Sequence, residues 1–337
     1  MSPTRYELLE SINDINRNQW NNVVETSRYS SFFQSHEWQR LIEEGIGLEP
    51  RHIVASRGDN ITSIFPNYFR PIGNSPFKRL YSIRPGYGGH IILSSDEKGV
   101  LDSMYNYIPK LCCGNAVSHY IVTYDLNYTR YGEYMRRMGY EPRLECRFVI
   151  DLDQSLDTIL GNMSHQKRRI VNRCGDVEVV ERKIGKSELQ DFHMHHTKLM
   201  GQVKGEAYPQ AFFTKMEDII PDNVKIFEAV CNGNSAGQIM FFLDPLQKTV
   251  HKFFSGIEKE CLKSNPTDAI VWHTLQWAKD NGYRYYDFGP TGDDFCNGVF
   301  RHKSGFGGQI LPMVMWERVF SKKRWRFVDL MKRIHYR

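Results

Sequence analysis

The sequence predicts an α+β fold made of two similar units in tandem, each with a mixed, mainly antiparallel sheet flanked by helices. Both halves show the same order of predicted elements, namely strand, turn, strand, helix, a Gly-aromatic step and a further strand. Residues 53–66 also align with residues 228–241 as a faint internal repeat. In addition, residues 136–140 (RRMGY) resemble residues 279–283 (KDNGY), and each is predicted to close a helix before a strand. Duplication of one α+β unit is the simplest account of these similarities.

The first unit is predicted to span residues 1–145. Ser35 is the predicted N-cap of a helix that has Trp38 on its buried side. Residues 57–60 (RGDN) are predicted to form a tight turn between two strands. Hydrophobic periodicity predicts strands at 52–56, 61–69 and 119–124 and helices at 102–111 and 131–138.

The second unit is predicted to span residues 146–312. Ser155 is the expected N-cap of a helix, and Asn281-Gly282 is a usual C-terminal stop for another. The predicted strands are 147–152, 177–180, 225–230, 236–243, 249–255 and 285–289, and the predicted helices are 156–173, 187–200 and 268–280.

The composition is that of a globular protein. The 337 residues are 25% charged and 41% apolar, which separates the chain from disordered sequences. No run of eighteen apolar residues occurs, so no transmembrane helix is predicted, and the N-terminus lacks the apolar core of a signal peptide. The seven cysteines are scattered without a CxxC pair. We therefore predict no metal site and no disulfide framework, and we expect a cytoplasmic protein.

The formal charge of +5 is concentrated in two places. The third predicted segment, residues 313–337, is expected to be helical, and its residues 318–337 carry eight Lys or Arg against a single Asp. The second basic cluster is Lys167-Arg168-Arg169. The C-terminal segment could contact tRNA or other RNA phosphates, rest on anionic lipid head groups at the inner face of the membrane, or dock against the protein as a terminal helix. The sequence does not decide among these three interpretations of the segment.

One part of the chain carries a specific motif. Residues 286–290 (YDFGP) followed by residues 297–307 (NGVFRHKSGFG) resemble the C-terminal signature of the Fem-like branch of the GNAT acyltransferases, which ends in a Lys-x-x-Phe-Gly block. Further family features are resembled, in the same order along the chain, by the entry segment 33–38 (FQSHEW), the basic residues 167–170 and the helix at 269–282. The resemblance therefore extends over nearly the whole chain.

This resemblance implies a tandem GNAT protein that transfers an acyl group. The implied donor is acyl-coenzyme A or an aminoacyl-tRNA, and the implied acceptor is an amine on a small molecule or a cell-envelope precursor. The sequence departs from the family where a lysine is replaced by Ile42 and a phenylalanine by His302. Neither the usual GNAT pyrophosphate loop nor a long helical arm for tRNA is apparent, so the donor stays open.

The resemblance also implies which residues carry the chemistry. Transfer to an amine requires removal of a proton, stabilisation of an oxyanion and fixed geometry, but no covalent nucleophile. Lys303 is the first candidate, as a cation for the donor phosphates or the oxyanion; otherwise it is a solvated loop lysine. Asp287, at a strand end, is expected to orient or deprotonate the acceptor amine, or alternatively to cap the next turn.

Five further residues are expected to bind substrate. The implied binding residues are Lys167, Arg168, Gly305, Phe306 and Gly307. For the two cations the alternative is a solvated helix face, and for the phenylalanine it is a place in the core. Beside the acyltransferase, the competing function is a non-catalytic GNAT-like module that binds a nucleotide sugar or an anionic membrane surface.

Overall fold

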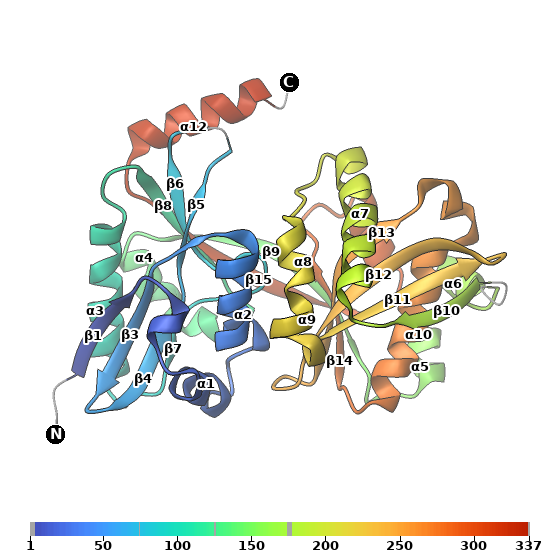
Figure 1. Cartoon of the computed structure of the whole chain (residues 1–337), viewed down its shortest axis with the longest axis horizontal. Helices are drawn as coiled ribbons and strands as arrows, with labels where there is room; N and C mark the ends of the chain where they lie inside the picture. The colour runs from blue at the N-terminus through green and yellow to red at the C-terminus, as the bar shows by residue number, and fades with distance from the viewer. Residues whose placement is uncertain (1–3, 74, 125, 174–176, 336–337) are drawn as a thin grey trace. The chain divides into compact units, whose positions relative to one another are not determined.

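The computed structural model describes residues 4–73, 75–124, 126–173 and 177–335. The chain forms two compact units (Figure 1). The first unit contains Met1–Leu144 and Met313–Arg337, and the second contains Glu145–Pro312. The chain passes into the second unit within β9 (Glu141–Asp151) and returns within β15 (Gln309–Val319).

The first unit holds two groups of strands. β1 (Thr4–Leu9), β3 (His52–Arg57), β4 (Asn60–Phe65) and β7 (Ile91–Ile92) form an antiparallel sheet in the order β1-β3-β4-β7. The C-terminal part of β15 pairs with β8, followed by β6, β5 and β2. These strands are β8 (Ala116–Val122), β6 (Lys78–Ser82), β5 (Tyr68–Pro71) and β2 (Glu49–Pro50). All pairs are antiparallel except β6 with β8, which is parallel.

Helices cover these strands and bury two apolar clusters. The helices of the first unit are α1 (Arg17–Thr26), α2 (His36–Leu41), α3 (Glu97–Leu111), α4 (Gly132–Arg137) and α12 (Lys322–His335), with a short π-helix at Ile42–Ile46 and 3-10 turns at Ile12–Asp14, Phe32–Gln34 and Leu126–Tyr131. As predicted, the Ser35 side chain caps α2 by accepting from the backbone N–H of Trp38, which is fully buried. The apolar face of α3, including Met104 and Ile108, packs in the cluster that contains Leu80 of β6.

The second unit is built on one mainly antiparallel sheet in the order β10-β11-β12-β13-β14-β9. Its strands are β10 (Val177–Arg182), β11 (Val224–Cys231), β12 (Asn234–Asp244), β13 (Thr249–Ile257) and β14 (Tyr285–Pro290), with the C-terminal part of β9. The pair β13 and β14 is parallel, whereas β14 and β9 are antiparallel. Its central strands β12 and β14 are buried on both faces because helices cover each face.

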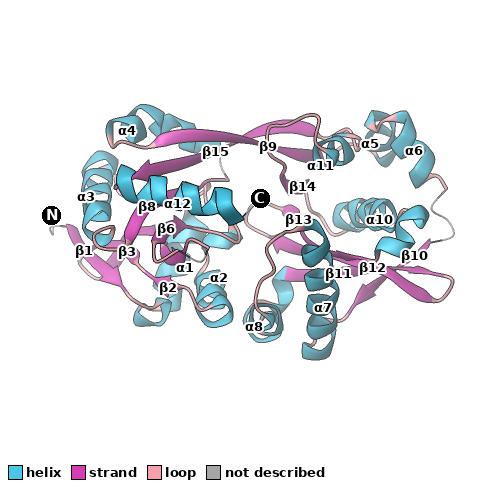
Figure 2. Ribbon diagram, turned by 90° about the horizontal axis from the view of Figure 1, so that it is seen from above, coloured by secondary structure: helices cyan, strands magenta, loops and turns pink. Residues whose placement is uncertain are grey.

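The helices of the second unit lie on opposite sides of this sheet, as Figure 2 shows for α7 and α10. They are α5 (Leu156–Asn162), α6 (His165–Val171), α7 (Lys186–Val203), α8 (Gln210–Thr214), α9 (Met216–Ile219), α10 (Pro266–Asp280) and α11 (Gly298–Ser304), with 3-10 turns at Pro221–Asn223 and Lys259–Ser264. α10 begins with Pro266 at a position that needs no donor. Its apolar face packs on Phe227, Phe241 and Tyr286 of the sheet.

The α+β prediction and the similarity of the halves are confirmed by the topology. Each unit contains one parallel pair of strands, and in each the two strands are joined through a helix of 15 residues, α3 in the first unit and α10 in the second. The sequence resemblance between residues 136–140 and 279–283 does not match this pairing of α3 with α10. Residues 279–283 close α10, whereas residues 136–140 close α4 rather than α3.

Two predicted helices differ in the structure. The helix expected at 156–173 is two helices, α5 and α6, because Met163 is extended and the Ser164 side chain caps a new helix by accepting from the backbone N–H of Lys167. The C-terminal segment begins as a strand, since β15 runs to Val319, and becomes helical only in α12. Among the described residues, no helix is both long enough and apolar enough to cross a membrane.

Candidate active site

Strands β13 and β14 separate at the point where the predicted site residues lie. They pair only from Thr249 with Tyr285 to His251 with Asp287. Beyond that pair, β13 is bulged at Phe253 and continues along β12, while β14 continues along β9. The residues that follow on each strand, Lys252 and Gly289, are close in space: a Cβ at Gly289 would lie 3.3 Å from the Lys252 carbonyl oxygen.

Asp287 is fully buried and has several polar partners. Arg147 Nη1 donates to its Oδ2 at 2.7 Å, and His251 Nδ1 lies 3.4 Å from the same oxygen. The backbone N–H of Gly289 donates to Oδ1 at 2.8 Å. Burial alone would raise the pKa of this carboxyl, but the Arg147 charge and the His251 contact hold the pKa well below its usual range. An anion that is so fully engaged is a weak proton acceptor.

Lys303 lies on α11 with only 8% of its surface exposed. Glycines flank it at 298, 305, 307 and 308, a pattern that predicts flexible or tightly turning backbone, but residues 298–304 form a helix capped by Asn297, whose side chain accepts from the backbone N–H of Val299. The ammonium donates to the carbonyl oxygens of Gly289 at 3.1 Å and Pro290 at 2.8 Å. An ammonium has three donors, so one of them is left for a further acceptor.

The structure thus links the two predicted catalytic residues through Gly289. Its N–H binds Asp287 and its carbonyl oxygen accepts from Lys303. Burial, followed by the like charge of Lys252, lowers the pKa of Lys303 to about 7. Burial also lowers the pKa of Lys252 to about 8. Two lysines that share a poorly solvated region near the separated strands form a centre of positive potential.

Lys167 belongs to a second group beside this centre. Its ammonium forms a buried ion pair with Asp268 in the first turn of α10, lies 3.0 Å from His302 Nδ1, and is 4.7 Å from the centre of the Phe306 ring. Burial and the nearby Lys167 charge lower the pKa of His302 to about 4, so this imidazole is neutral at pH 7. Its Nε2 is buried without a hydrogen-bond partner among the described residues.

The other predicted binding residues are placed differently. Arg168 points away from this group, because its Nη1 donates to the carbonyl oxygen of Gly161 in α5 at 2.6 Å. Phe306 is fully buried in the core beside Phe288. The structure therefore brings Lys167 and Phe306 together and does not bring Arg168 to them.

The two predicted glycines are required by close packing. A Cβ on Gly305 would lie 3.0 Å from Lys167 Cγ, and one on Gly307 would lie 2.2 Å from the carbonyl oxygen of Asn162. Gly307 also has a φ of +77°, which side chains of L-residues rarely adopt. These contacts press the segment after α11 against the turn between α5 and α6.

A cavity of about 220 Å³ opens beside this segment within the second unit. Its polar walls are the side chains or backbone of Asp151, Gln154, Asn162 and Gln309, and Phe306 borders it. Among the described residues that line it there is no lysine, arginine or histidine. The cavity therefore suits a neutral or amine-bearing group better than a phosphate.

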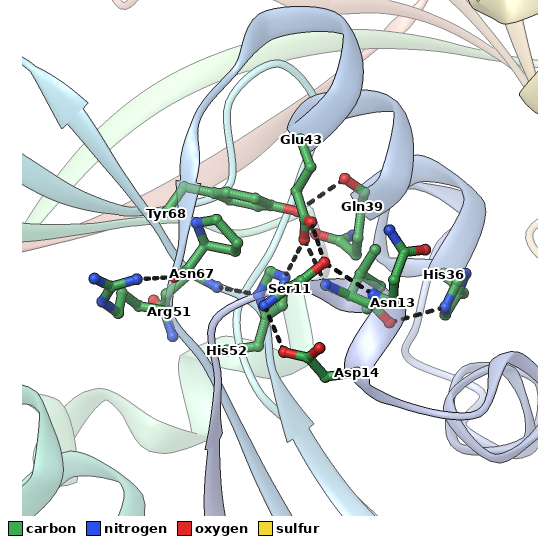
Figure 3. Close-up of polar contacts among 12 residues, drawn as sticks. Ser11, Asn13, Asp14, His36, Gln39, Glu43, Arg51, His52, Asn67 and Tyr68 are labelled. Carbon is green, nitrogen blue, oxygen red and sulfur yellow. Dashed lines mark hydrogen bonds and ion pairs between the residues drawn. The ribbon is translucent and has the colours of Figure 1, made fainter.

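A separate network of hydrogen-bonded polar side chains lies in the first unit (Figure 3). The Glu43 carboxylate accepts from Ser11 Oγ at 3.0 Å and from the backbone N–H of Ile12 at 2.8 Å, and it lies 3.2 Å from His52 Nε2. The other ring nitrogen of His52 accepts from the backbone N–H of Asn67 at 3.1 Å. Burial lowers the pKa of His52, which keeps the ring neutral. Because each member is satisfied, we assign this network to the support of the fold.

Sequence reasoning missed several residues of the site. They are Arg147, His251, Lys252 and Asp268. One signal was present for two of them: His251-Lys252 interrupts an otherwise apolar predicted strand, and adjacent polar residues in a buried strand need partners. Nothing in the sequence pairs Arg147 with Asp287, which is 140 positions away.

Comparison with known proteins places this geometry in context. Residues 158–304 match the family model described as the acetyltransferase (GNAT) domain. A search of curated proteins found no match.

The structure is similar to several solved structures at low sequence identity. FemX superposes with a TM-score of 0.70 at 10% identity, covering 96% of this chain and 100% of FemX. L-PGS from Bacillus licheniformis has a TM-score of 0.59 at 13% identity, with 93% of this chain and 96% of that chain covered. A tandem GNAT protein from the clavulanic acid biosynthesis pathway has a TM-score of 0.58 at 10% identity, with 94% and 98% covered.

At sequence identities this low, the structural similarity establishes the fold alone. The resemblance to Fem-like proteins seen in residues 286–307 is confirmed at that level, since both units have counterparts in FemX. The chain therefore has the tandem GNAT fold of Fem-like proteins, and within its second unit residues 158–304 match the acetyltransferase (GNAT) domain.

Proposed function

We propose that the second unit transfers an acyl group from a bound activated donor to an amine, with Lys303 as the catalytic cation. The observation that carries this proposal is the Lys303 ammonium, which is anchored on the carbonyl oxygens of Gly289 and Pro290 where β13 and β14 separate. An anchored ammonium with one remaining donor can bind an oxyanion without reorganisation, and such preorganised donors supply about 3–4 kcal/mol in acyl transfer.

In the proposed step the neutral acceptor amine attacks the acyl carbon and forms the new C–N bond. The carbonyl electrons move to oxygen, where Lys303 stabilises the charge. Collapse breaks the C–S bond of a thioester, or the C–O bond of an ester, and the departing thiolate or alkoxide takes a proton from Lys303. The proton released by the new amide nitrogen returns to Lys303, so the balance closes without a covalent enzyme intermediate.

Lys252 and Asp287 take supporting roles in this proposal. Burial and, after it, the like charge of Lys252 lower the pKa of Lys303 to about 7, which makes proton donation to the leaving group easier at neutral pH. Asp287 fixes Arg147 and the Gly289 backbone, which in turn holds Lys303. This positioning role replaces proton abstraction as the proposed function of Asp287.

For the substrate groups we propose that Lys167 supports the donor side through His302 and that the cavity beside Phe306 and Gly307 receives a polar part of a substrate. The donor is acyl-coenzyme A or an aminoacyl-tRNA, and the acceptor is an amine on a small molecule or a cell-envelope precursor. Arg168 lies outside this group, and we propose that it contacts only the solvent-facing end of the donor.

The test is a comparison of donors with the full-length protein. A donor that binds the native state should raise the free energy of unfolding by about 2.7 kcal/mol at a hundredfold its Kd, and the same donor should support transfer to an amine. We expect this for acetyl-coenzyme A or for a charged tRNA. Stabilisation by a nucleotide sugar, with no turnover of either donor, would replace the proposal with a non-catalytic binding module.

A further inference from the structure

Helix α12 has an inner face that is held by the first unit and an outer face that is largely exposed, where the Phe327 ring contacts Phe77 with 6.0 Å between the ring centres. Val328 is buried, and the Trp325 ring lies 4.8 Å below the Arg79 guanidinium. Arg324 Nη1 donates to the carbonyl oxygen of Gly114. Figure 1 shows α12 beyond the ends of β5 and β6. The helix is therefore fixed in place, and its outer side chains have a defined direction.

The outer face carries exposed apolar and basic side chains together. Lys323, Arg326, Phe327 and Leu330 follow the i, i+3, i+4, i+7 spacing of one helix face, and all four are exposed. Phe327 is 46% and Leu330 is 55% exposed, and Met331 next to them is 38% exposed. In a helix held on its other side, such a run of large apolar side chains in water needs an explanation.

Helical periodicity arranges the cations on both sides of this apolar stripe. With 100° per residue, Phe327, Leu330 and Met331 form one band that also holds Lys323, while Lys322 and Arg326 border it on one side and Arg324, which donates to the Gly114 carbonyl oxygen, borders it on the other. An apolar stripe flanked by Lys and Arg is the pattern of helices that lie in the interface of a lipid bilayer. Phosphates of RNA would use the cations but would leave the aliphatic members of the stripe in water.

We propose that the outer face of α12 binds the surface of an anionic lipid bilayer and so holds the first unit there. The apolar stripe enters the boundary between head groups and acyl chains, and the cations contact lipid phosphates. This proposal is independent of the chemistry at Lys303, because none of the residues that it rests on takes part in the proposed reaction.

The experiment uses the full-length protein and sedimentation with two kinds of vesicle. We expect it to pellet with vesicles of phosphatidylcholine containing about 30% phosphatidylglycerol and to stay in solution with pure phosphatidylcholine. Added salt should weaken the binding, because surface charges are screened. Equal pelleting with both vesicles, or with neither, would overturn the proposal.

Charge-reversal variants identify the surface. The variant Lys322→Glu, Lys323→Glu and Arg326→Glu should bind the anionic vesicles about 100-fold more weakly, since each basic residue near an anionic surface contributes about 1 kcal/mol. Its control reverses three exposed lysines of the second unit, Lys183, Lys186 and Lys263, and changes the net charge equally. Loss of binding in both variants alike would mean a non-specific charge effect and would refute a site on α12.

Two further measurements test whether the apolar stripe contributes to binding or whether the basic side chains alone account for it. Leu330→Ser with Met331→Ser keeps every charge, and we expect it to bind vesicles at least tenfold more weakly with an unchanged urea midpoint. Competition with a short unstructured RNA should leave vesicle binding of the wild-type protein unchanged at 0.15 M salt. If RNA displaces the vesicles and the double serine variant still binds them, α12 is a nucleic-acid surface instead.

Discussion

Replacing Lys252 by methionine should move the pH dependence of the reaction in a defined direction. In the proposed step Lys303 acts in its protonated form, so the rate falls as pH rises through the pKa of Lys303. Lys252 contributes to lowering that pKa to about 7, after burial, which is the largest cause. Methionine has a similar length and no charge, so the variant removes this repulsion, and the falling limb of the profile shifts to higher pH.

The size of the shift follows from the electrostatics. Two neighbouring like charges repel by about 1–2 kcal/mol in an effective dielectric of about 20, which corresponds to roughly 0.7–1.5 pH units. Lys252 is itself only partly protonated at pH 8, because its own pKa is lowered to about 8. We therefore expect a shift of about one pH unit.

The assay is kcat measured between pH 5.5 and 9.5 at saturating donor and acceptor. Lys252→Arg keeps the charge and serves as the matched control, with its falling limb near that of the wild type. A limb that stays in place in Lys252→Met, or one that moves to lower pH, would show that Lys303 is not the titrating acid or that Lys252 does not act on it.

Three stability predictions test the contacts that hold the site. Asp287→Asn should lower the free energy of unfolding by about 3–5 kcal/mol at pH 7, because it removes the carboxylate that pairs with the buried Arg147 guanidinium; a loss below 1 kcal/mol in urea denaturation would contradict the pairing. Lys167→Met and Asp268→Asn should show a coupling energy of about 1–3 kcal/mol in a double-mutant cycle, and additive losses would mean that the pair does not interact. Gly307→Ala should destabilise by at least about 2 kcal/mol more than Gly233→Ala, which has a similar φ but open space; equal losses would disprove the close approach.

The native Asp287 ion pair also predicts a dependence of stability on pH. A carboxyl whose pKa is lowered by folding contributes stability above its unfolded pKa, and this contribution is lost as pH falls through the folded value. The wild-type protein should therefore lose stability below about pH 4 more steeply than Asp287→Asn does. Urea midpoints of both proteins at pH 3, 4 and 7 would check this, and parallel curves would contradict it.

The order of elements was largely predictable, because it depends on local signals. Ser35 as a cap, Asn281-Gly282 as a stop and the alternation of apolar residues in the strands each act over a few positions. The break between α5 and α6 was missed although Ser164 is a good capping residue, because the apolar periodicity continues through it. The helical state of Lys303 was missed because the four glycines nearby favour a loop, whereas Asn297 caps a helix there.

The site was predictable only in part, because its main contacts connect distant parts of the chain. The motif at 286–307 identified Asp287 and Lys303, but the partners that set their charge states are on β9 and β13. Lys167 was expected on a helix face that binds substrate, and the structure buries it against Asp268. Periodicity can place a residue on a face, but it cannot give the neighbour across the sheet.

Turnover of Lys303→Met and Lys303→Arg, at saturating concentrations of whichever donor the wild-type protein uses, tests the central role of this ammonium most directly. Methionine should fill the buried space, leave the urea midpoint nearly unchanged and reduce kcat by about 100- to 1,000-fold, the usual effect of removing one preorganised donor. Arginine should restore part of the rate and keep it at higher pH, because a guanidinium stays charged. A methionine variant that keeps kcat within about threefold of the wild type would contradict the account.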